Sequence, residues 1–145
     1  MRLSTKGRYA VMAMTDLARR DGERAVALAD IAARQEISLA YLEQLFARLR
    51  REGLVISARG PGGGYRLARP AAKTTIADIV VAVDEPLRTT RCSGEAHKGC
   101  MTKGERCLTH DLWDEMGRRI RDYLASVTLD DVANGRLSPA RPEAA

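Results

Sequence analysis

The sequence predicts a mainly helical fold with a small β-hairpin: a winged helix-turn-helix domain followed by a long C-terminal helix. Three observations predict it. Two short amphipathic helices lie close together within residues 26–53, a glycine-rich hairpin pattern follows at 54–69, and one long apolar stripe runs through 109–127. At 145 residues the chain suits one domain, or a small domain with an attached arm, and a second core is not expected.

The first predicted helix begins after Ser4 and Thr5, either of which can cap it, and ends near Asp21. Lys6 and Arg8 lie in its first turn, where positive charge opposes the helix dipole. An external anion such as a phosphate would balance these charges. The alternative is that both side chains are solvated surface.

Two short helices follow, at 26–36 and from Ser38 to Gly53, separated by a break at Ile37. Ser38 can cap the second helix and Gly53 supplies its stop. This is the helix-turn-helix pattern, in which the second helix enters the major groove of DNA. Many small helical domains share it, so the pattern alone is a weak signal. The apolar faces consist of Leu28, Ile31 and Ala32 in the first helix and Leu42, Leu45, Phe46 and Leu49 in the second.

A β-hairpin with a glycine-rich tip is predicted next. LVISAR at 54–59 and YRLAR at 65–69 read as strands, and GPGGG at 60–64 separates them. A wing with a bare backbone and one cation, Arg59, suits the narrow, electronegative minor groove. A glycine-rich nucleotide cradle is the alternative, but such loops lead from a strand into a helix, whereas a second strand follows here.

The distribution of charge supports the same interpretation. Residues 1–70 carry 13 Lys and Arg against 7 Asp and Glu, a net charge of +6, whereas residues 71–145 carry 11 against 12, a net charge of −1. A basic first half is typical of nucleic-acid binding, with solubilisation as the alternative. We therefore expect residues 1–70 to be the DNA-binding region and a double-stranded DNA operator to be its partner.

No apolar segment resembles a signal peptide or approaches the length of a membrane span. The expectation is a cytoplasmic protein that contacts no membrane. The chain has 3 cysteines, and an odd number in a reducing compartment argues against a disulfide framework. The possible roles that remain for these cysteines are metal binding, cofactor binding and redox sensing.

After Pro70, Thr75 and Asp78 have the spacing of a capping box and open a short helix. No convincing periodicity appears from 85 to 107, and a loop of that length is normally functional or disordered. Thr109 can cap the last long helix, whose apolar stripe is long for a chain with little left to cover it, which favours a dimerisation helix over intramolecular core. The stripe consists of Leu112, Trp113, Met116, Ile120, Tyr123, Leu124 and Val127.

The end of the chain has two features. Thr128 and Asp131 again have the capping-box spacing, which predicts a short capped turn. The segment 134–145 is rich in Pro and Ala and is expected to be a disordered tail. Residues 71–133 are accordingly expected to hold a cofactor-binding loop and the dimerisation helix.

The loop at 91–110 holds every cysteine and histidine of the chain in a polar, glycine-rich setting that packing does not require. Seven and six residues separate Cys92, Cys100 and Cys107, and His110 follows Cys107 by three. Structural zinc normally uses closer pairs of cysteines. The wide gaps suit an iron-sulfur cluster, whose usual ligands are thiolates. His97 is the rival fourth ligand, but the start of a helix would fix the geometry of His110.

Two other classes of protein stay open at this point. A zinc-stabilised DNA-binding module would use the same residues, and an electron-transfer protein could hold a redox centre there but has no need of a wing. An enzyme is not expected, because both histidines lie inside the ligand loop and no nucleophile and base are paired beside another histidine.

In combination these motifs resemble the bacterial family of winged-helix regulators that includes nitrite- and iron-responsive members. The resemblance covers about residues 1–133 and rests on MRLSTKGRYAV, ISLAYLEQLFARLRREGLV, RGPGGGYRLA, AVDEPLRTTRC and CLTHDLW. It implies a dimeric transcription factor that carries a 2Fe-2S cluster and controls iron-sulfur cluster assembly genes. Carried onto this chain, the cluster ligands would be Cys92, Cys100, Cys107 and His110.

The chain departs from the family pattern at two places. The cysteine gaps are longer, which bears on cluster geometry and stability, and Ala40 stands where a serine is usual. Tyr41, Glu43 and Gln44 match the pattern. The Glu43 carboxylate would accept a hydrogen bond from cytosine or repel phosphates. The alternative is a solvated charge that pairs with Arg50 or Arg51. The expected DNA-binding residues are Arg2, Lys6, Arg8, Ser38, Ala40, Tyr41, Glu43, Gln44, Arg59, Gly60, Gly62 and Gly63.

Overall fold

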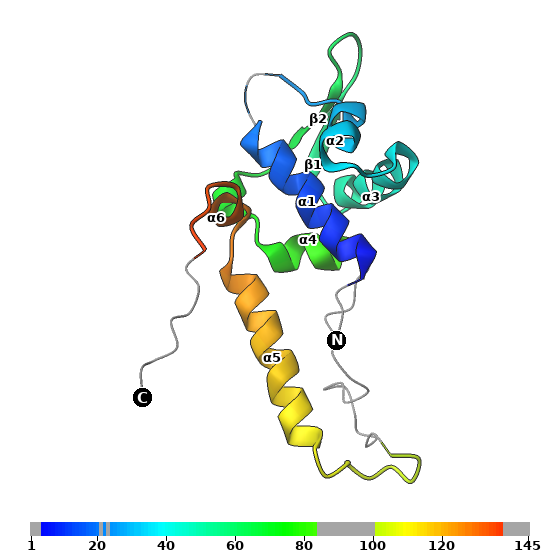
Figure 1. Cartoon of the computed structure of the whole chain (residues 1–145), viewed down its shortest axis with the longest axis vertical. Helices are drawn as coiled ribbons and strands as arrows, with labels where there is room; N and C mark the ends of the chain where they lie inside the picture. Colours follow the sequence, from blue (N-terminus) through cyan, green and yellow to red (C-terminus); the bar gives the residue numbers. More distant parts are fainter. Residues whose placement is uncertain (1–3, 21, 23, 84–100, 138–145) are drawn as a thin grey trace.

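The computed structural model of the chain describes residues 4–20, 22, 24–83 and 101–137. It contains the predicted mainly helical fold with one β-hairpin. In Figure 1, α1 to α4, the hairpin and α6 form one body, and α5 extends away from it. The elements are α1 (Thr5–Arg19), α2 (Leu28–Gln35), α3 (Leu39–Arg51), β1 (Val55–Ala58), β2 (Gly64–Leu67), the 3-10 helix η1 (Ala71–Lys73), α4 (Ile76–Ala82), α5 (His110–Ser126) and α6 (Leu129–Ala133).

The pair α2 and α3 forms as the sequence predicts. The Ser38 hydroxyl accepts a hydrogen bond from the backbone N–H of Tyr41 at 3.4 Å, and Gly53 adopts a positive φ of 75° after α3. Every residue of the two predicted apolar faces is buried. Phe46 is fully buried and packs edge-to-face on Tyr65 of β2, with ring centroids 5.0 Å apart. This contact joins α3 to the hairpin.

The predicted start of the second helix is wrong at Val26. Val26 is extended and pairs with Tyr65: its N–H donates to the Tyr65 carbonyl at 2.9 Å and its carbonyl accepts from the Tyr65 N–H at 2.8 Å. The helix begins only at Leu28. A partner 39 positions away along the chain therefore overrides the local helical pattern.

The hairpin pairs in a fixed antiparallel register, with Val55 opposite Leu67 and Ala58 opposite Gly64. Gly64 lies against the pairing segment at Val26, and a Cβ there would overlap the Val26 carbonyl oxygen. Only glycine permits this approach. The base of the hairpin is thereby tied to the connection between α1 and α2.

Both predicted capping boxes are confirmed. Thr75 and Asp78 exchange hydrogen bonds at the start of α4, and Thr128 and Asp131 do the same at the start of α6. The two starts lie side by side, because Leu129 N–H donates to the Thr74 carbonyl at 2.7 Å. Leu129 is fully buried, and α6 packs on α1. The chain beyond α5 thus returns to the body.

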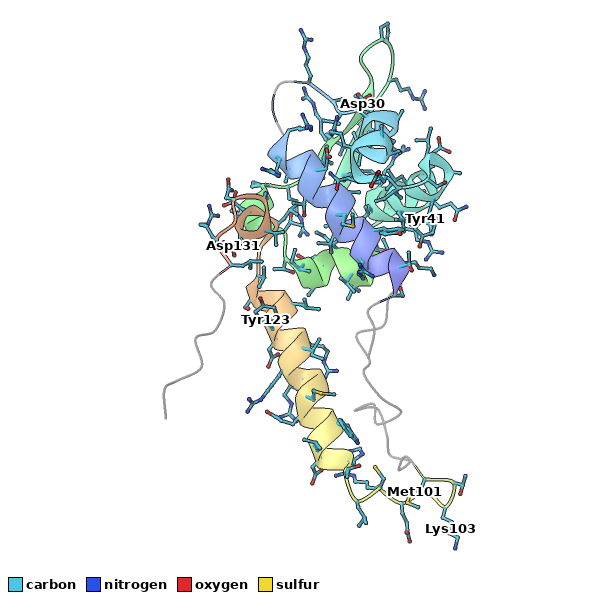
Figure 2. The ribbon with its side chains drawn as sticks, viewed as in Figure 1. Asp30, Tyr41, Met101, Lys103, Tyr123 and Asp131 are labelled. Atoms are coloured by element: carbon cyan, nitrogen blue, oxygen red, sulfur yellow. The ribbon has the colours of Figure 1, made fainter. Side chains whose placement is uncertain are left out.

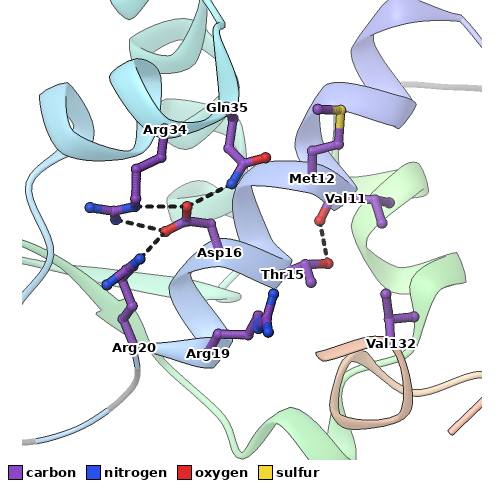
Figure 3. Close-up of a pocket in the computed structure, with 9 residues that line it drawn as sticks. All are labelled: Val11, Met12, Thr15, Asp16, Arg19, Arg20, Arg34, Gln35 and Val132. Atoms are coloured by element: carbon purple, nitrogen blue, oxygen red, sulfur yellow. Dashed lines mark hydrogen bonds and ion pairs between the residues drawn. The ribbon is translucent and has the colours of Figure 1, made fainter. Parts of the chain in front are cut away.

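One carboxylate lies inside the body. Asp16 of α1 is 5% exposed and receives hydrogen bonds from Arg34 at 2.7 and 3.0 Å and from Gln35 at 2.8 Å. Arg20 adds an ion pair at 3.4 Å. Figure 3 shows these side chains converging on Asp16 from α1 and the end of α2. This group of residues, the Asp16 cluster, fixes the first helix of the helix-turn-helix against α1.

The described part of the C-terminus ends at Leu137. There Arg136 forms ion pairs with Asp130 and Asp131 of α6. Residues 138–145, most of the predicted disordered tail, lie outside the described residues. Within the part of the chain that the structure describes, no helix has the length and apolar character needed to cross a bilayer.

Candidate nucleic-acid interface and cofactor-binding segment

The start of α3 and its exposed side carry four of the twelve residues predicted to bind DNA. Ser38, Ala40, Glu43 and Gln44 are exposed. Across the described residues Glu43 forms no ion pair with Arg50 or Arg51, so the alternative that these charges neutralise each other on the helix does not hold here. Its carboxylate is available to a ligand.

Tyr41 is half-buried because it packs edge-to-face on Tyr9, with ring centroids 5.9 Å apart. The stack holds the first turn of α1 beside the first turn of α3. The exposed cations Lys6 and Arg8 therefore lie near the start of the recognition helix. From the sequence, Tyr9 is expected only to belong to the first helix. The one sequence signal for its role in positioning α1 beside α3 is that an aromatic residue stands close to the cations Lys6 and Arg8.

The wing tip has the bare backbone that the sequence predicts. Gly60 and Gly62 adopt positive φ angles of 95° and 75°, and the Gly63 N–H donates to the Gly60 carbonyl at 2.8 Å. A Cβ on Gly63 would lie 2.6 Å from the Ala58 carbonyl oxygen, closer than side chains tolerate. Arg59 is exposed at the start of this tip. Figure 1 shows the tip projecting beyond α2 and α3. The predicted contact Arg2 lies outside the described residues.

The cofactor-binding segment is described only in part. Cys92, Cys100 and the rival ligand His97 lie outside the described residues. Cys107 is half-buried and His110 is 7% exposed, and the His110 N–H donates to the Cys107 carbonyl at 3.1 Å. One turn of chain at the start of α5 thus joins these two predicted ligands. In the described part of the chain, no group of three or more possible metal ligands comes together.

Thr109 occupies the N-cap position of α5, but the prediction that its side chain caps the helix is wrong. Its hydroxyl accepts a hydrogen bond from the indole N–H of Trp113 at 2.9 Å instead. The side chain is turned toward the next turn of the helix, away from the first N–H groups. The Trp113 indole is thereby tied to the residue that precedes α5.

The two regions lie at opposite ends of the molecule. Figure 2 shows Tyr41 on the body and Met101 and Lys103 beyond the start of α5, at the other extreme. Tyr123 lies near the end of α5 that meets the body. Helix α5 therefore leads from the segment that holds Cys107 to the side of the body formed by α4.

Much of the predicted apolar stripe on α5 remains uncovered in the single chain. Leu112 and Tyr123 are each 59% exposed and Trp113 is 36% exposed. Only Val127, at the end of the stripe, is buried. The body covers the end of the stripe at Leu124 and Val127 and leaves Leu112, Trp113 and Tyr123 exposed to solvent.

Comparison with known proteins decides the family. A profile of the Rrf2 family, described as iron-dependent transcriptional regulators, matches residues 3–135. The chain belongs to the Rrf2 family. It is a DNA-binding transcriptional regulator with a winged helix, as the resemblance in its motifs implied.

Relatives of this Rrf2 protein are similar over most of their length. The HTH-type transcriptional regulator IscR of Photorhabdus laumondii is 52% identical over 136 residues, which cover 94% of this chain and 81% of that protein. IscR of Pectobacterium carotovorum is 53% identical over the same shares.

Solved structures show the same architecture. T. potens IscR superposes with a TM-score of 0.75 at 35% identity, covering 99% of this chain and 94% of that one. CymR, the global cysteine regulator of B. subtilis, superposes with a TM-score of 0.79 at 33% identity, covering 93% of this chain and 98% of that one. The winged-helix fold of this chain is thus shared with two solved regulators.

Proposed function

We propose that the chain is a homodimeric regulator in which a 2Fe-2S cluster sets the choice of operator and so controls genes for iron-sulfur cluster assembly. The observation that carries the proposal is the place of Cys107 and His110 at the start of α5, whose other end is fixed to the DNA-binding body. A change at the first turn of α5 is transmitted along one rigid helix. Because it acts on operators, the regulator is placed in the cytoplasm.

The donor atoms suit such a cluster. Cys92, Cys100, Cys107 and His110 would supply three thiolates and one imidazole, and thiolates are the usual ligands of iron-sulfur clusters. The bound cluster would give the protein a state that depends on the supply of clusters and on their oxidation. The protein contributes the helix that couples that state to the body.

The contacts with DNA are proposed at the start of α3, the first turn of α1 and the wing. In this arrangement Glu43 and Gln44 meet base edges in the major groove, and Arg59 enters the minor groove. Residues 71–133 then hold the cluster-binding loop and the dimerisation helix. Two copies of α5 packed by their apolar stripes would set the spacing of two recognition helices.

The ligand set is tested by spectroscopy of anaerobically purified protein with iron and sulfide analysis. We expect coloured protein with equal amounts of iron and sulfide, because zinc is colourless and brings no sulfide. Cys107→Ser and His110→Ala should lose or weaken the absorption, whereas His97→Ala, the matched control, should retain it. Colourless protein that binds zinc, or loss of colour in His97→Ala alone, would overturn the assignment.

A further inference from the structure

The outer face of the wing carries a shallow hollow between the hairpin and the connection that precedes α2. Its lining includes Arg24, Ile56, Pro61, Gly62 and Arg66. Ile56 and Arg66 lie opposite each other on β1 and β2, and Ile56 is 52% exposed. Pro61 and Gly62 belong to the wing tip. The hollow therefore runs from the base of the wing to the tip that is proposed to enter the minor groove.

The fold fixes the two arginines relative to each other. Val26 is held to Tyr65 by the pair of backbone hydrogen bonds described above, and Gly64 admits the close approach of the two segments. Arg24 precedes Val26 by two residues and Arg66 follows Tyr65 by one. Their placement on one hollow thus follows from backbone pairing, so neither depends on a flexible loop alone.

Neither guanidinium has a carboxylate partner among the described residues, and no acidic residue lines the hollow. Elsewhere on the protein, Arg34, Arg69 and Arg118 each form an ion pair with Asp or Glu. Two unneutralised guanidinium groups on one concave face favour an external anion. Guanidinium binds phosphate oxygens with paired hydrogen bonds.

We propose that Arg24 and Arg66 bind backbone phosphates of the DNA strand that borders the minor groove entered by the wing. The inference rests on the proposed placement of the wing. The walls of the minor groove are the phosphates themselves, so a duplex that receives Pro61 and Gly62 passes one phosphate strand along the outer face of the wing. Ile56 would cover the neighbouring sugar. These contacts position the duplex and read no base.

The test measures operator affinity over a series of salt concentrations for full-length, cluster-loaded protein. For Arg24→Ala and Arg66→Ala we expect about tenfold weaker binding each. The slope of log affinity against log salt should become shallower by about 0.9 for each phosphate that the variant no longer neutralises. Non-operator duplex should weaken by the same factor. Arg24→Lys and Arg66→Lys should keep the slope, and Lys73→Ala, an exposed cation in η1, is the matched control.

The phosphate itself is located by a double-mutant cycle. Duplexes with one neutral methylphosphonate at a time should bind wild-type protein more weakly at the contacted position, and Arg66→Ala should be insensitive to that position. Unchanged affinity and salt slope in the doubly substituted Arg24→Ala, Arg66→Ala protein would overturn the inference. If Arg59→Ala also binds normally, the wing does not contact DNA and the proposed interface fails with it; if Arg59→Ala binds weakly, only the present inference fails.

Discussion

Replacing Leu112 and Tyr123 by glutamate is expected to convert the regulator into monomers and to weaken operator binding by about 100-fold or more. Both side chains are 59% exposed in the single chain, so their replacement removes no intramolecular core. A buried carboxylate in each of two facing helices would oppose association. Two linked recognition helices bind two half-sites together, and a monomer loses that gain. Sedimentation equilibrium and fluorescence anisotropy measure the two effects.

Ala125→Glu is the matched control, since it introduces the same residue at an exposed position on the opposite side of α5. It should remain dimeric and bind normally. A doubly substituted protein that stays dimeric would show that the apolar stripe is not the interface. A monomer with full affinity would show that dimerisation does not govern DNA binding.

Replacing Asp16 by alanine should lower the free energy of unfolding by about 3 kcal/mol. The carboxylate is 5% exposed, and the substitution removes its charged hydrogen bonds to Arg34 and Gln35. The Arg34 side chain is 31% exposed, so water can hydrate it once Asp16 is removed. The loss of unfolding free energy therefore lies at the lower end of the range for breaking a buried ion pair. Urea unfolding measures the change.

Asp114→Asn is the control for the Asp16 variant. It removes a surface ion pair with Arg118 and should cost at most about 0.5 kcal/mol. Equal losses in the two variants would show that the Asp16 cluster is no stronger than an ordinary surface pair. A loss confined to Asp16→Ala would support its role in holding α2 on α1.

The Asp16 cluster also predicts how stability depends on pH. Burial raises the pKa of Asp16, but hydrogen bonds from Arg34 and Gln35 and the charges of Arg34 and Arg20 outweigh it, so the pKa lies below its usual value of 3.8. A depressed pKa in the folded protein stabilises the fold above the unfolded value. The stability difference between wild type and Asp16→Asn should be constant well above pH 3.8 and shrink as the pH falls through that value and below it.

Elements with strong local signals could be predicted from the sequence. Ser38 at the start of α3, Gly53 after it, and the capping boxes of Thr75 and Thr128 depend on residues within a few positions, and the structure has all of them. The glycine-rich wing tip is equally local. Two of the motifs that carry the family resemblance, ISLAYLEQLFARLRREGLV and RGPGGGYRLA, lie on α3 and the hairpin, so the family could be inferred from the sequence.

The structure differs from the sequence-based predictions mainly where a partner far away along the chain determines how a residue is placed. Val26 fits a helical pattern but pairs with Tyr65, and Arg34 and Gln35, the partners of buried Asp16, lie 18 and 19 positions away from it. The outer-face arginines follow the same logic, because only the Val26 pairing brings Arg24 to the hollow that Arg66 lines. Contacts between residues this far apart cannot be predicted from the spacing of residues along the chain. Thr109 is an exception, because its cap position is overridden by a local partner, the Trp113 indole one turn away.

The central claim is that cluster state sets the choice of operator. Its most direct test is the affinity of one preparation for a panel of duplexes at fixed salt, measured anaerobically with the cluster present and again after its removal. We predict that the affinity for some duplexes falls on removal while that for others changes little, so that their ranking shifts. Identical affinities at every duplex in both states would contradict the account.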